Sequence, residues 1–511
     1  MKVAALTGAG FWAMAGNASR AQPLANGRPN VGGFGVGGHG TGDIAAAAQF
    51  CDVTVICDVD RHRLGQAQER YPYAKAYTDY RVAFDEMEDS MDVVTVSTPD
   101  HTHAVIGLRA MRARKHAYVQ KPITRTIYEA RLMGEVAREM GVVTQMGNQH
   151  SASNRLRQGA AQLKAGVLGT LKEVHVWSNR PVWPQAPGRR MSLDIFSERT
   201  RAERPDQADR LIAARRAEID RLLENLDWEN WLGPAPYRPF WPDDYHAFRW
   251  RGWWDFGSGA LGDMANHTFN QSYAGCDLKN PTSVVAKSSG HDFDSYPARS
   301  EIKFEFPAND WRPALDCWWY DGGWRPPAEL MARYGIALDD SNRSGALVIG
   351  ERGAMYDPGD NGGNWRLVAE GGESFDPLPN VQYVANRGGH HGEFFRSVIE
   401  NTPEDCFSNF PDYAGPFTET ILLGNLAVWA ASEADEWGEK VEWDAVNLVV
   451  TNVSSLQTPG VADLVKPVFR EGHVLDVPTE RTTFTPVRGP IRRLMDARRQ
   501  RLLNAQQQRQ Q

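Results

Sequence analysis

The sequence predicts two α/β units: a doubly wound, parallel domain at the N-terminus, and a C-terminal α+β domain with an open, largely antiparallel mixed sheet. Three observations carry this prediction. A glycine-rich stretch, residues 32–42, follows a short strand and precedes a helical pattern. Strand-like and helical segments then alternate up to about residue 150, as parallel βαβ units require. Beyond that point, strand-like runs are separated by long loops with few helices, which favours an antiparallel sheet.

The first half of the chain alternates β-branched runs with helical patterns. Each β-branched run is short and ends in a turn, which is typical of the buried strands of a parallel sheet. This spacing places the doubly wound domain over residues 29–150. The predicted strands are 53–57, 93–97, 117–119 and 142–145, and the predicted helices are 43–50, 61–71, 104–115 and 123–140.

Residues 151–465 are assigned to the second domain. Within it, residues 189–226 are highly charged and resemble an insertion. From Pro205 onward, apolar residues recur at the spacing of one helical face, which predicts a flap or contact helix, with a solvated helix as the alternative. Residues 466–511 form a C-terminal extension and tail. The predicted strands are 171–177, 282–287, 301–306, 315–319 and 345–349, and the predicted helices are 259–273 and 418–434.

Composition excludes several classes of protein. The net charge of −8 argues against nucleic acid as the main partner. The five cysteines are scattered without a CxxC pair, so neither a disulfide framework nor a cysteine zinc site is expected. No apolar run reaches about 18 residues, so we expect no membrane span. Residues 1–28 are signal-like, with a disordered arm as the alternative, and predict a periplasmic or secreted protein, otherwise a cytoplasmic one.

The glycine-rich stretch contains a cofactor-binding motif. Residues Gly35 to Gly40 fit GxGxxG, and Asp58 ends the next predicted strand. Glycines let the backbone approach a pyrophosphate at a helix N-terminus, while the acid accepts hydrogen bonds from the ribose. The sequence therefore predicts a Rossmann domain that binds NAD. A carboxylate at position 58 repels a 2′-phosphate, but Arg61 and Arg63 lie close enough to keep NADP open.

Lys121 lies between an apolar strand and Pro122, which precedes a helical pattern. Proline suits the first position of a helix, so we expect Lys121 to face a helix N-terminus at the carboxyl end of the strand. That position disfavours the ammonium form, lowers the lysine pKa and suits an acid or base. A surface Lys-Pro turn is the alternative.

Two other groups of polar residues are candidates for the site. Thr98, Pro99, Asp100, His101 and His103 follow the next strand, at the sheet edge where ligands of such domains bind. The two histidines alone are a partial ligand set, so no metal site is predicted.

A further pair stands on the predicted helix 259–273. Asp263 and His267 are one helical turn apart, so the carboxylate is expected to raise the histidine pKa and to orient its ring. A surface or capping pair is the alternative.

These residues together resemble the glucose–fructose oxidoreductase / inositol dehydrogenase (Gfo/Idh/MocA) family, over about residues 30–460. The resemblance implies catalytic roles for Lys121, Asp263 and His267, which would relay a proton from a sugar hydroxyl. It also implies a second domain that contributes to substrate binding and to oligomer contacts. The cofactor-binding residues expected from motif and resemblance are Gly35, Gly37, Gly38, His39, Gly40, Asp58, Thr98, Pro99, Asp100, His101, Gln120 and Asn148.

One residue departs from the family pattern. Gln120 stands before the lysine where the family usually has Glu. Because an amide supplies no charge, we expect the Lys121 pKa to be lower than in relatives.

The substrate site is less defined by the sequence. His103, Arg180, Trp183 and Trp254 are the substrate-binding candidates, the tryptophans as platforms for sugar faces, with buried packing as their alternative.

The sequence thus favours an NAD(P)-dependent oxidoreductase that acts on a sugar, polyol or glycoside hydroxyl. One alternative is a glycosidase that retains NAD and oxidises its substrate transiently. Another is a non-catalytic, nucleotide-dependent sugar-binding or sensing protein, which Gln120 suggests. The expected partners are a small carbohydrate and further copies of the chain, joined through the C-terminal sheet.

Overall fold

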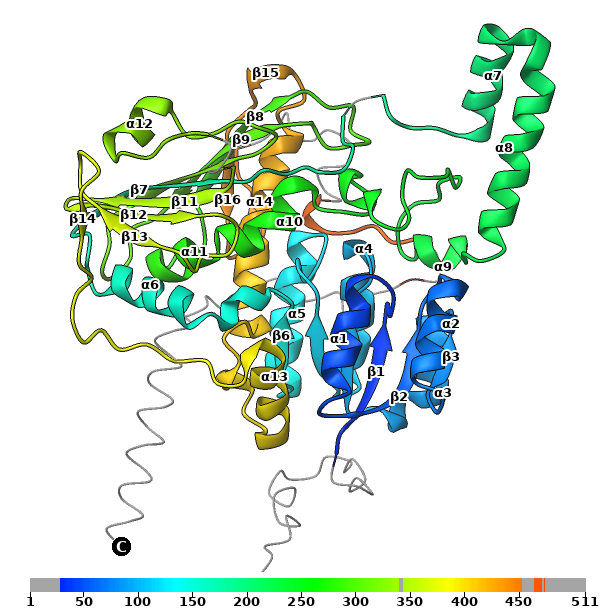
Figure 1. Ribbon diagram of the computed structural model, residues 1–511, viewed down its shortest axis with the longest axis horizontal. Helices are drawn as coiled ribbons and strands as arrows, with labels where there is room; N and C mark the ends of the chain where they lie inside the picture. The colour runs from blue at the N-terminus through cyan, green and yellow to red at the C-terminus, as the bar shows by residue number, and fades with distance from the viewer. Residues whose placement is uncertain (1–27, 187, 340–342, 453–463, 471–472, 474–511) are drawn as a thin grey trace, which may run out of the picture.

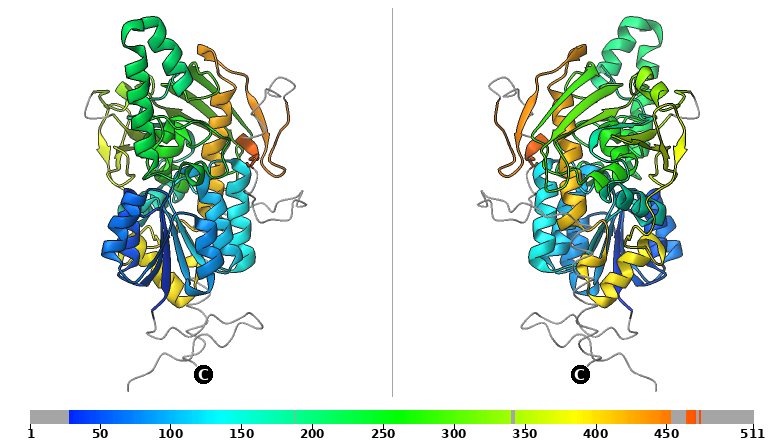
Figure 2. Two further views of the ribbon diagram at one scale, coloured as in Figure 1. Left: turned by 90° about the vertical axis from the view of Figure 1, so that its right-hand side faces the viewer. Right: turned by 90° about the vertical axis from the view of Figure 1, so that its left-hand side faces the viewer.

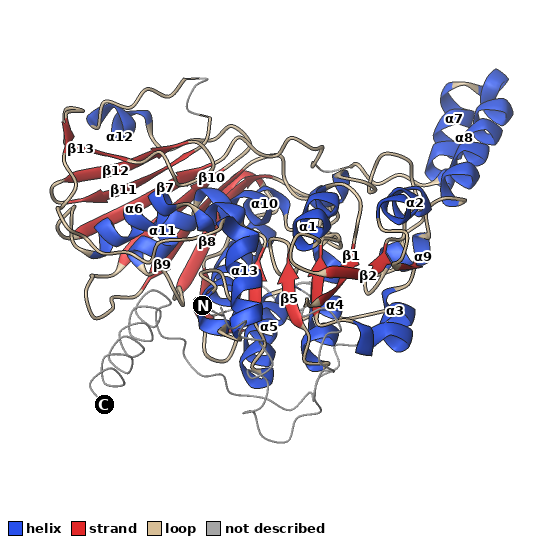
Figure 3. Cartoon of the chain, turned by 60° about the horizontal axis from the view of Figure 1, so that its bottom comes forward, coloured by secondary structure: helices blue, strands red, loops and turns tan. Residues whose placement is uncertain are grey.

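The computed structural model describes residues 28–186, 188–339, 343–452, 464–470 and 473. The signal-like N-terminal segment and most of the predicted C-terminal tail therefore lie outside the described residues. The described chain forms two sheets, which Figure 3 shows as separate groups of strands. None of the helices in the described ranges is long and apolar enough to cross a membrane.

The N-terminal sheet has six described strands in the order β3-β2-β1-β4-β5-β6, all parallel. This order is that of a Rossmann fold, so the predicted doubly wound domain is confirmed. The prediction missed β3 because it is a three-residue edge strand without an apolar run. The strands are β1 (Asn30–Phe34), β2 (Asp52–Cys57), β3 (Lys75–Tyr77), β4 (Val93–Val96), β5 (His116–Val119) and β6 (Thr144–Met146). The helices are α1 (His39–Ala47), α2 (Arg61–Arg70), α3 (Tyr80–Met87), α4 (Asp100–Arg112) and α5 (Ile127–Met140).

Helix α5 begins four residues later than predicted. Thr126 is its N-cap: the hydroxyl accepts the Glu129 N–H, and the Glu129 carboxylate accepts the Thr126 N–H. This capping box satisfies the first turn better than Pro122, which supplies no side-chain acceptor. Lys121 therefore lies in a loop before the helix, and the expectation that it faces a helix N-terminus is wrong.

The second sheet is open and mixed, as predicted. Its described strands run in the order β14-β13-β12-β11-β7-β10-β9-β8-β16-β17, with β15 beside β8. Only β7 and β10 pair in parallel among these strands; the others pair antiparallel. Burial alternates along β9, so one face packs on the core. The strands are β7 (Leu171–Trp177), β8 (Ser283–Ser289), β9 (Ser300–Phe306), β10 (Leu315–Tyr320), β11 (Gly345–Gly350), β12 (Gly353–Pro358), β13 (Arg366–Val368), β14 (Ser374–Phe375), β15 (Ala434–Trp437), β16 (Val441–Asp444) and β17 (Val449–Val450).

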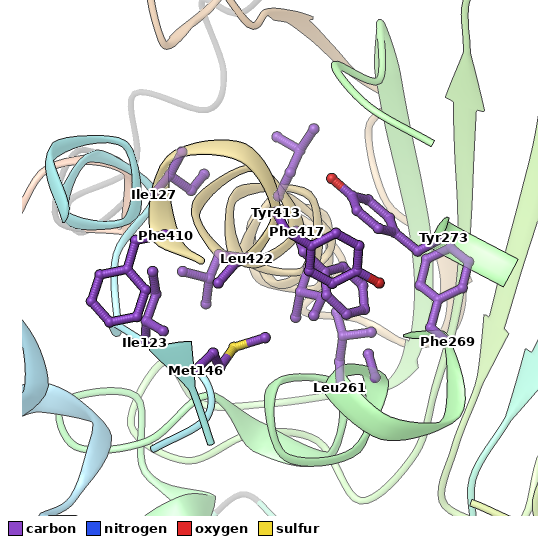
Figure 4. Packing of buried hydrophobic residues seen from close by; sticks show 14 of the residues in the cluster. Ile123, Ile127, Met146, Leu261, Phe269, Tyr273, Phe410, Tyr413, Phe417 and Leu422 are labelled. Carbon is purple, nitrogen blue, oxygen red and sulfur yellow. The ribbon is translucent and has the colours of Figure 1, made fainter. Parts of the chain in front are cut away.

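Helices α6 (Asn154–Lys164), α10 (Gly259–Thr268), α11 (Asn270–Cys276) and α14 (Gly415–Trp429) form a layer beside this sheet, while α12 (Ala328–Arg333) lies at its far end (Figure 1). Helix α14 also packs on α5 of the first domain. Figure 4 shows this junction: Ile127 and Phe410 lie on one side of Leu422, and the rings of Phe417 and Tyr273 lie on the other. The interface between the two domains is therefore a continuous apolar core, which fixes their relative position.

Two later segments return to the first domain. Helix α13 (Gly389–Glu400) buries Phe394 and Phe395 against the apolar cluster around β1. Just before α9 (Trp228–Leu232), the Asp227 N–H donates to the Val59 carbonyl and the Arg61 N–H donates to the Asn225 carbonyl. The segment before α9 therefore lies beside the end of β2, where cofactor contacts were predicted.

The predicted insertion forms a helical hairpin. Helices α7 (Leu193–Glu203) and α8 (Ala208–Leu223) pack on each other and project from the body of the protein (Figures 1 and 2). The prediction of one helix from Pro205 is corrected in two respects. Pro205 opens a short 3-10 turn, so α8 starts at Ala208, and a second helix precedes it with Ser192 as its N-cap.

Candidate active site

One cavity of about 670 Å³ lies at the carboxyl edge of the Rossmann sheet. It extends from the glycine loop to Lys121 and is closed on its far side by residues of the second domain. Such edges are where open α/β sheets bind ligands. The predicted site residues that line it are Gly35, Gly37, Gly38, His39, Asp58, Thr98, Pro99, Asp100, His103, Gln120, Lys121, Arg180, Asp263 and His267.

The glycine loop has the geometry of a phosphate cradle. Helix α1 starts directly after it, and its N-cap Gly38 makes no side-chain hydrogen bond to the first turn. A Cβ atom at Gly40 would lie 1.8 Å from the Gly35 carbonyl oxygen, so only glycine permits this approach of helix and loop. Gly40 therefore supports the loop from outside the cavity. The helix N-terminus, which no side chain caps, supplies a favourable dipole for an anion.

Asp58 holds this loop in place. Its Oδ2 accepts hydrogen bonds from the N–H groups of Val36 and Gly37, each at 3.0 Å, and its Oδ1 accepts the Asp60 N–H. Burial raises the pKa of the Asp58 carboxyl above its usual value. Arg63 lies over the same loop, since a Cβ atom at Gly37 would be 2.3 Å from its Cδ.

Residues of the second domain cover the glycine-loop end of the cavity. His246 Nε2 lies 2.9 Å from Asp60 Oδ2, and Asn230 Oδ1 accepts a hydrogen bond from Arg81. Trp231, Phe248 and other residues of 230–251 complete the lining. Sequence reasoning did not assign these residues, because the contacts join segments far apart in the chain.

Lys121 is paired with Asp263 at the opposite end. Its Nζ donates to Asp263 Oδ1 at 2.6 Å and to the Asp263 backbone carbonyl at 2.8 Å, and Arg251 Nε donates to the same Oδ1 at 3.2 Å. Burial alone would raise the pKa of Asp263, but Lys121 and Arg251 hold it well below its usual value. Asp263 is therefore the opposite-charge partner of Lys121, a role that the Gln120 amide cannot fill.

Gln120 belongs to a separate hydrogen-bond network beneath the site. Its Nε2 donates to Asp43 Oδ2 at 2.8 Å, and the same oxygen accepts the Ser97 hydroxyl. His391 lies 3.2 Å from the other Asp43 oxygen. The Gln120 amide packs flat on Gly147, where a Cβ atom would lie 2.6 Å from it. The side chain of Gln120 therefore interacts with Asp43 and not with the side chain of Lys121.

His267 differs from its predicted electrostatic state. Burial, and then the charge of Lys121, push its pKa well below the usual value, and the attraction of Asp263 does not outweigh them. In the described part of the chain no hydrogen bond joins Asp263 to His267, and His267 Nδ1 is without a partner. The ring of His150 meets that of His267 edge-on at 5.8 Å. His267 is thus a neutral imidazole, and the expectation of a raised pKa is corrected.

The histidines after β4 lie against backbone carbonyl groups, and His103 also lines the cavity. His103 spans the carbonyl oxygens of Pro122 and Thr98 at 2.8 and 2.7 Å and so ties two loops together. His101 lies outside the cavity lining, against the Trp231 carbonyl and ring. Burial lowers the pKa of His101 to about 3 and that of His103 to about 4. Among the described residues, no group of three or more His, Cys, Asp or Glu is arranged to hold a metal ion.

Three further predicted residues also lie outside the lining. Asn148 is buried and accepts a hydrogen bond from Ser408. Trp183 donates to Gln185, and Trp254 stacks on Tyr296 with ring centroids 3.7 Å apart. The tryptophans follow their packing alternative, because large aromatic side chains bury more surface in a core than on a cavity wall.

Asp100 is the acid of the site with a strongly raised pKa. It is buried at the start of α4, and burial raises its pKa to about 7 although Ser258 donates a hydrogen bond to it. The folded protein therefore binds this proton more tightly than the unfolded chain, so the contribution of Asp100 to stability falls as pH rises from about 4 to 7.

Replacing Asp100 by Asn is expected to remove this pH-dependent loss. A carboxyl pKa raised to about 7 corresponds to a loss of about 4 kcal/mol, and the benefit of removing it is reduced to about 2 kcal/mol by an amide N–H left without a partner. Urea unfolding at pH 5 and pH 8 measures the difference: the variant should gain relative to wild type only at the higher pH. An equal change in the free energy of unfolding at pH 5 and pH 8 would contradict the raised pKa of Asp100.

Residues 30–148 match a family model described as "Oxidoreductase family, NAD-binding Rossmann fold", and residues 212–309 match "Oxidoreductase family, C-terminal alpha/beta domain". The chain belongs to this Gfo/Idh/MocA family. Family membership confirms the resemblance, the fold class and the NAD-binding character of the first domain.

Individual relatives match over shorter stretches. Levoglucosan dehydrogenase of Pseudarthrobacter phenanthrenivorans is 24% identical over 117 residues, which are 23% of this chain and 30% of that protein. A glycosyl hydrolase family 109 protein of Shewanella pealeana is 31% identical over 111 residues, 19% of this chain and 24% of that protein. The chain thus spans less than a third of the length of these two curated relatives.

A solved structure shares the fold over most of its length. The WlbA dehydrogenase from Bordetella pertussis, solved in complex with NADH and UDP-GlcNAcA, superposes with a TM-score of 0.51. The match covers 82% of this chain and 99% of that one at 13% sequence identity.

Proposed function

We propose that this member of the Gfo/Idh/MocA family is an NAD-dependent oxidoreductase. It transfers a hydride between nicotinamide and a hydroxyl-bearing carbon of a sugar, polyol or glycoside. One observation carries the proposal: a single cavity joins the glycine loop and Asp58 to Lys121, Asp263 and His267. A cofactor laid along the sheet edge would bring its reactive end to these three residues.

The residues at the glycine-loop end fit a dinucleotide. The uncapped N-terminus of α1 suits the pyrophosphate, and Asp58 retains acceptor capacity on Oδ1 for a ribose hydroxyl. When bound, the cofactor supplies a hydride acceptor or donor. The carboxylate of Asp58 favours NAD, while Arg63 beside the loop keeps NADP as the alternative.

The protein's own groups supply the proton transfer. His267 is a neutral imidazole in the cavity and can accept the proton of a substrate hydroxyl. Lys121, held by Asp263, provides a fixed positive charge that stabilises the negative oxygen as this proton leaves. The roles assigned are therefore base for His267, electrostatic stabilisation for Lys121, and positioning of the lysine for Asp263.

A retained-cofactor glycosidase is the second candidate. The second-domain segments over the cofactor end support it: residues 225–227 pair with the β2–α2 turn, and His246 lies 2.9 Å from Asp60. A cofactor enclosed in this way would exchange slowly, which suits transient oxidation followed by reduction on the same protein. A non-catalytic sugar sensor has less support, because Asp263 gives Lys121 the charge partner that Gln120 does not.

One panel experiment tests these candidates. Purified protein is incubated with NAD or NADP and a series of free sugars, polyols and chromogenic glycosides, and both NADH absorbance and aglycone release are followed. We expect NADH to accumulate with at least one free sugar or polyol. Aglycone release without net NADH would favour the glycosidase instead. NAD binding without either signal would reject both enzymes and favour the sensor.

The domain bounds, the export and the oligomer predicted from the sequence are also proposed. We propose a first domain over residues 29–150, a second over 151–465, export directed by residues 1–28, and homo-oligomers formed through the second sheet. The face of that sheet over β8, β9 and β10 carries paired charges such as Lys287 with Glu301 and Lys303 with Asp316. An oligomer using this face would dissociate more readily at high salt, which sedimentation measures.

A further inference from the structure

The reacting end of the cavity carries more positive charge than Asp263 requires. Three cations line the cavity around this carboxylate: Lys121, Arg180 and Arg251. Lys121 Nζ at 2.6 Å already neutralises it, and Arg251 Nε reaches it at 3.2 Å. Arg180 Nε lies 3.7 Å from Asp263 Oδ2, beyond hydrogen-bonding distance. The two arginines are therefore not explained by Asp263 alone.

Both guanidinium groups keep unused donors. Arg251 uses Nε on Asp263 and Nη1 on the Phe248 carbonyl, while Arg180 uses Nη1 on Asn179. In the described ranges, Nη2 of either arginine has no acceptor. Their side chains are 22% and 24% exposed, so these donors are open to the cavity rather than sealed in the core.

Arg251 is also held rigidly. Its guanidinium carbon lies 4.2 Å from the ring centroid of Trp250 and 4.4 Å from that of Phe248. A guanidinium packed on aromatic faces keeps its in-plane N–H groups available while losing little freedom on binding. The group is thus preorganised for an incoming acceptor.

The neighbouring acids do not cancel this charge. Asp100 has a pKa raised by burial to about 7, so it is only partly ionised at neutral pH. Asp58 lies at the glycine-loop end near Arg63, and Asp360 accepts a hydrogen bond from Thr268. At this end of the cavity Lys121, Arg180 and Arg251 thus outnumber the carboxylates of Asp263 and Asp360.

We propose that Arg180 and Arg251 bind a carboxylate of the substrate, so that uronic acids and their glycosides are the preferred carbohydrates. This inference rests on the proposed function, whose substrate class it narrows. A planar carboxylate matches the fork of an arginine and can accept the unused Nη2 donors of both residues. The carboxylate would also anchor the sugar so that a ring hydroxyl lies near His267 and Lys121.

The experiment compares ligands that differ only in this group. Protein with and without NADH is titrated calorimetrically with methyl glucuronide, methyl galacturonide and their neutral parents, methyl glucoside and methyl galactoside. At least one uronide is expected to bind about 10- to 100-fold more tightly than its parent, with the difference shrinking at high salt. Equal or tighter binding of the neutral parents, or no binding of any uronide, overturns the proposal.

Variants connect the preference to the arginines. Arg180→Gln and Arg251→Gln should each reduce the ratio of uronide affinity to parent affinity about tenfold. Arg249→Gln, an exposed arginine of the same turn outside the cavity lining, should preserve it. Equal loss of affinity for uronide and parent in the cavity variants would overturn the assignment. Preference for glucose 6-phosphate over every uronide would also overturn it, in favour of a phosphate group. Because binding is measured without turnover, a uronide preference without any redox chemistry would reject the proposed function alone.

Discussion

Replacing Lys121 by methionine is expected to lower kcat about 10²- to 10⁴-fold while leaving the protein folded. The substitution keeps an unbranched side chain of similar length but removes the ammonium that lies 2.6 Å from Asp263 Oδ1. Without that charge, the substrate oxygen loses the ammonium group that we propose stabilises it as its proton passes to His267. Arg251 still donates to Asp263, so the buried carboxylate keeps a cation. Initial rates with the substrate identified in the panel measure the effect.

The matched control is Lys172→Met, which removes an exposed lysine of β7 far from the cavity lining. It should retain wild-type rates. NADH binding by fluorescence shows whether Lys121→Met still forms the cofactor site, because that end of the cavity is built by the glycine loop and Asp58. A Lys121→Met protein that binds NADH and works within about fivefold of wild type would remove the lysine from the mechanism.

Much of the fold could be predicted because its signals are local. The glycine loop, the strand that follows it and Asp58 lie within one βαβ unit, and each has a distinct residue pattern. In the second sheet the strand-like runs predicted β7 to β11, but the strands from β12 to β17 were not predicted. The short edge strand β3 and the start of α5 could not be read in this way, because β3 lacks an apolar run and a capping box overruled the proline signal at α5.

The electrostatics of the site could not be predicted, since they depend on distant residues. Lys121 and Asp263 are 142 positions apart, and Gln120 and Asp43 are 77 apart. The sequence placed Asp263 beside His267 by helical spacing, but tertiary structure turned the carboxylate toward three cations instead. Burial then lowered the histidine pKa, whereas the isolated pair predicts the opposite direction.

Restoring the residue that the family usually carries before the lysine is expected to damage this protein. Gln120 is buried, and its Nε2 donates to Asp43. Burial acts to raise the pKa of Asp43, but hydrogen bonds from His391, Ser97 and Gln120 hold it below its usual value, so this acid is ionised. In Gln120→Glu two buried carboxylates would meet at hydrogen-bonding distance, and the pKa of the new one would rise.

The sign of the pH dependence follows from that raised pKa. Below the unfolded pKa of a glutamic acid side chain, near 4.3, the folded variant carries a protonated carboxyl group at position 120 that still donates to Asp43. As pH rises, the unfolded chain releases this proton first, so stability is lost by about 1.4 kcal/mol per pH unit until the folded pKa is reached. We expect Gln120→Glu to lie within about 1 kcal/mol of wild type at pH 5 and about 3 kcal/mol below it at pH 8.

Urea unfolding at the two pH values measures this difference. Gln382→Glu is the matched control, because it introduces the same charge at an exposed loop position and should change stability little at either pH. If Gln120→Glu is as stable as wild type at pH 8, the hydrogen bond to Asp43 does not require an amide at position 120. The difference from the family pattern would then reflect only the loss of a negative charge beside Lys121. If the variant is less stable but its rate with saturating substrate is unchanged, the Gln120 amide stabilises the folded protein, and Asp263 alone is the charge partner of Lys121.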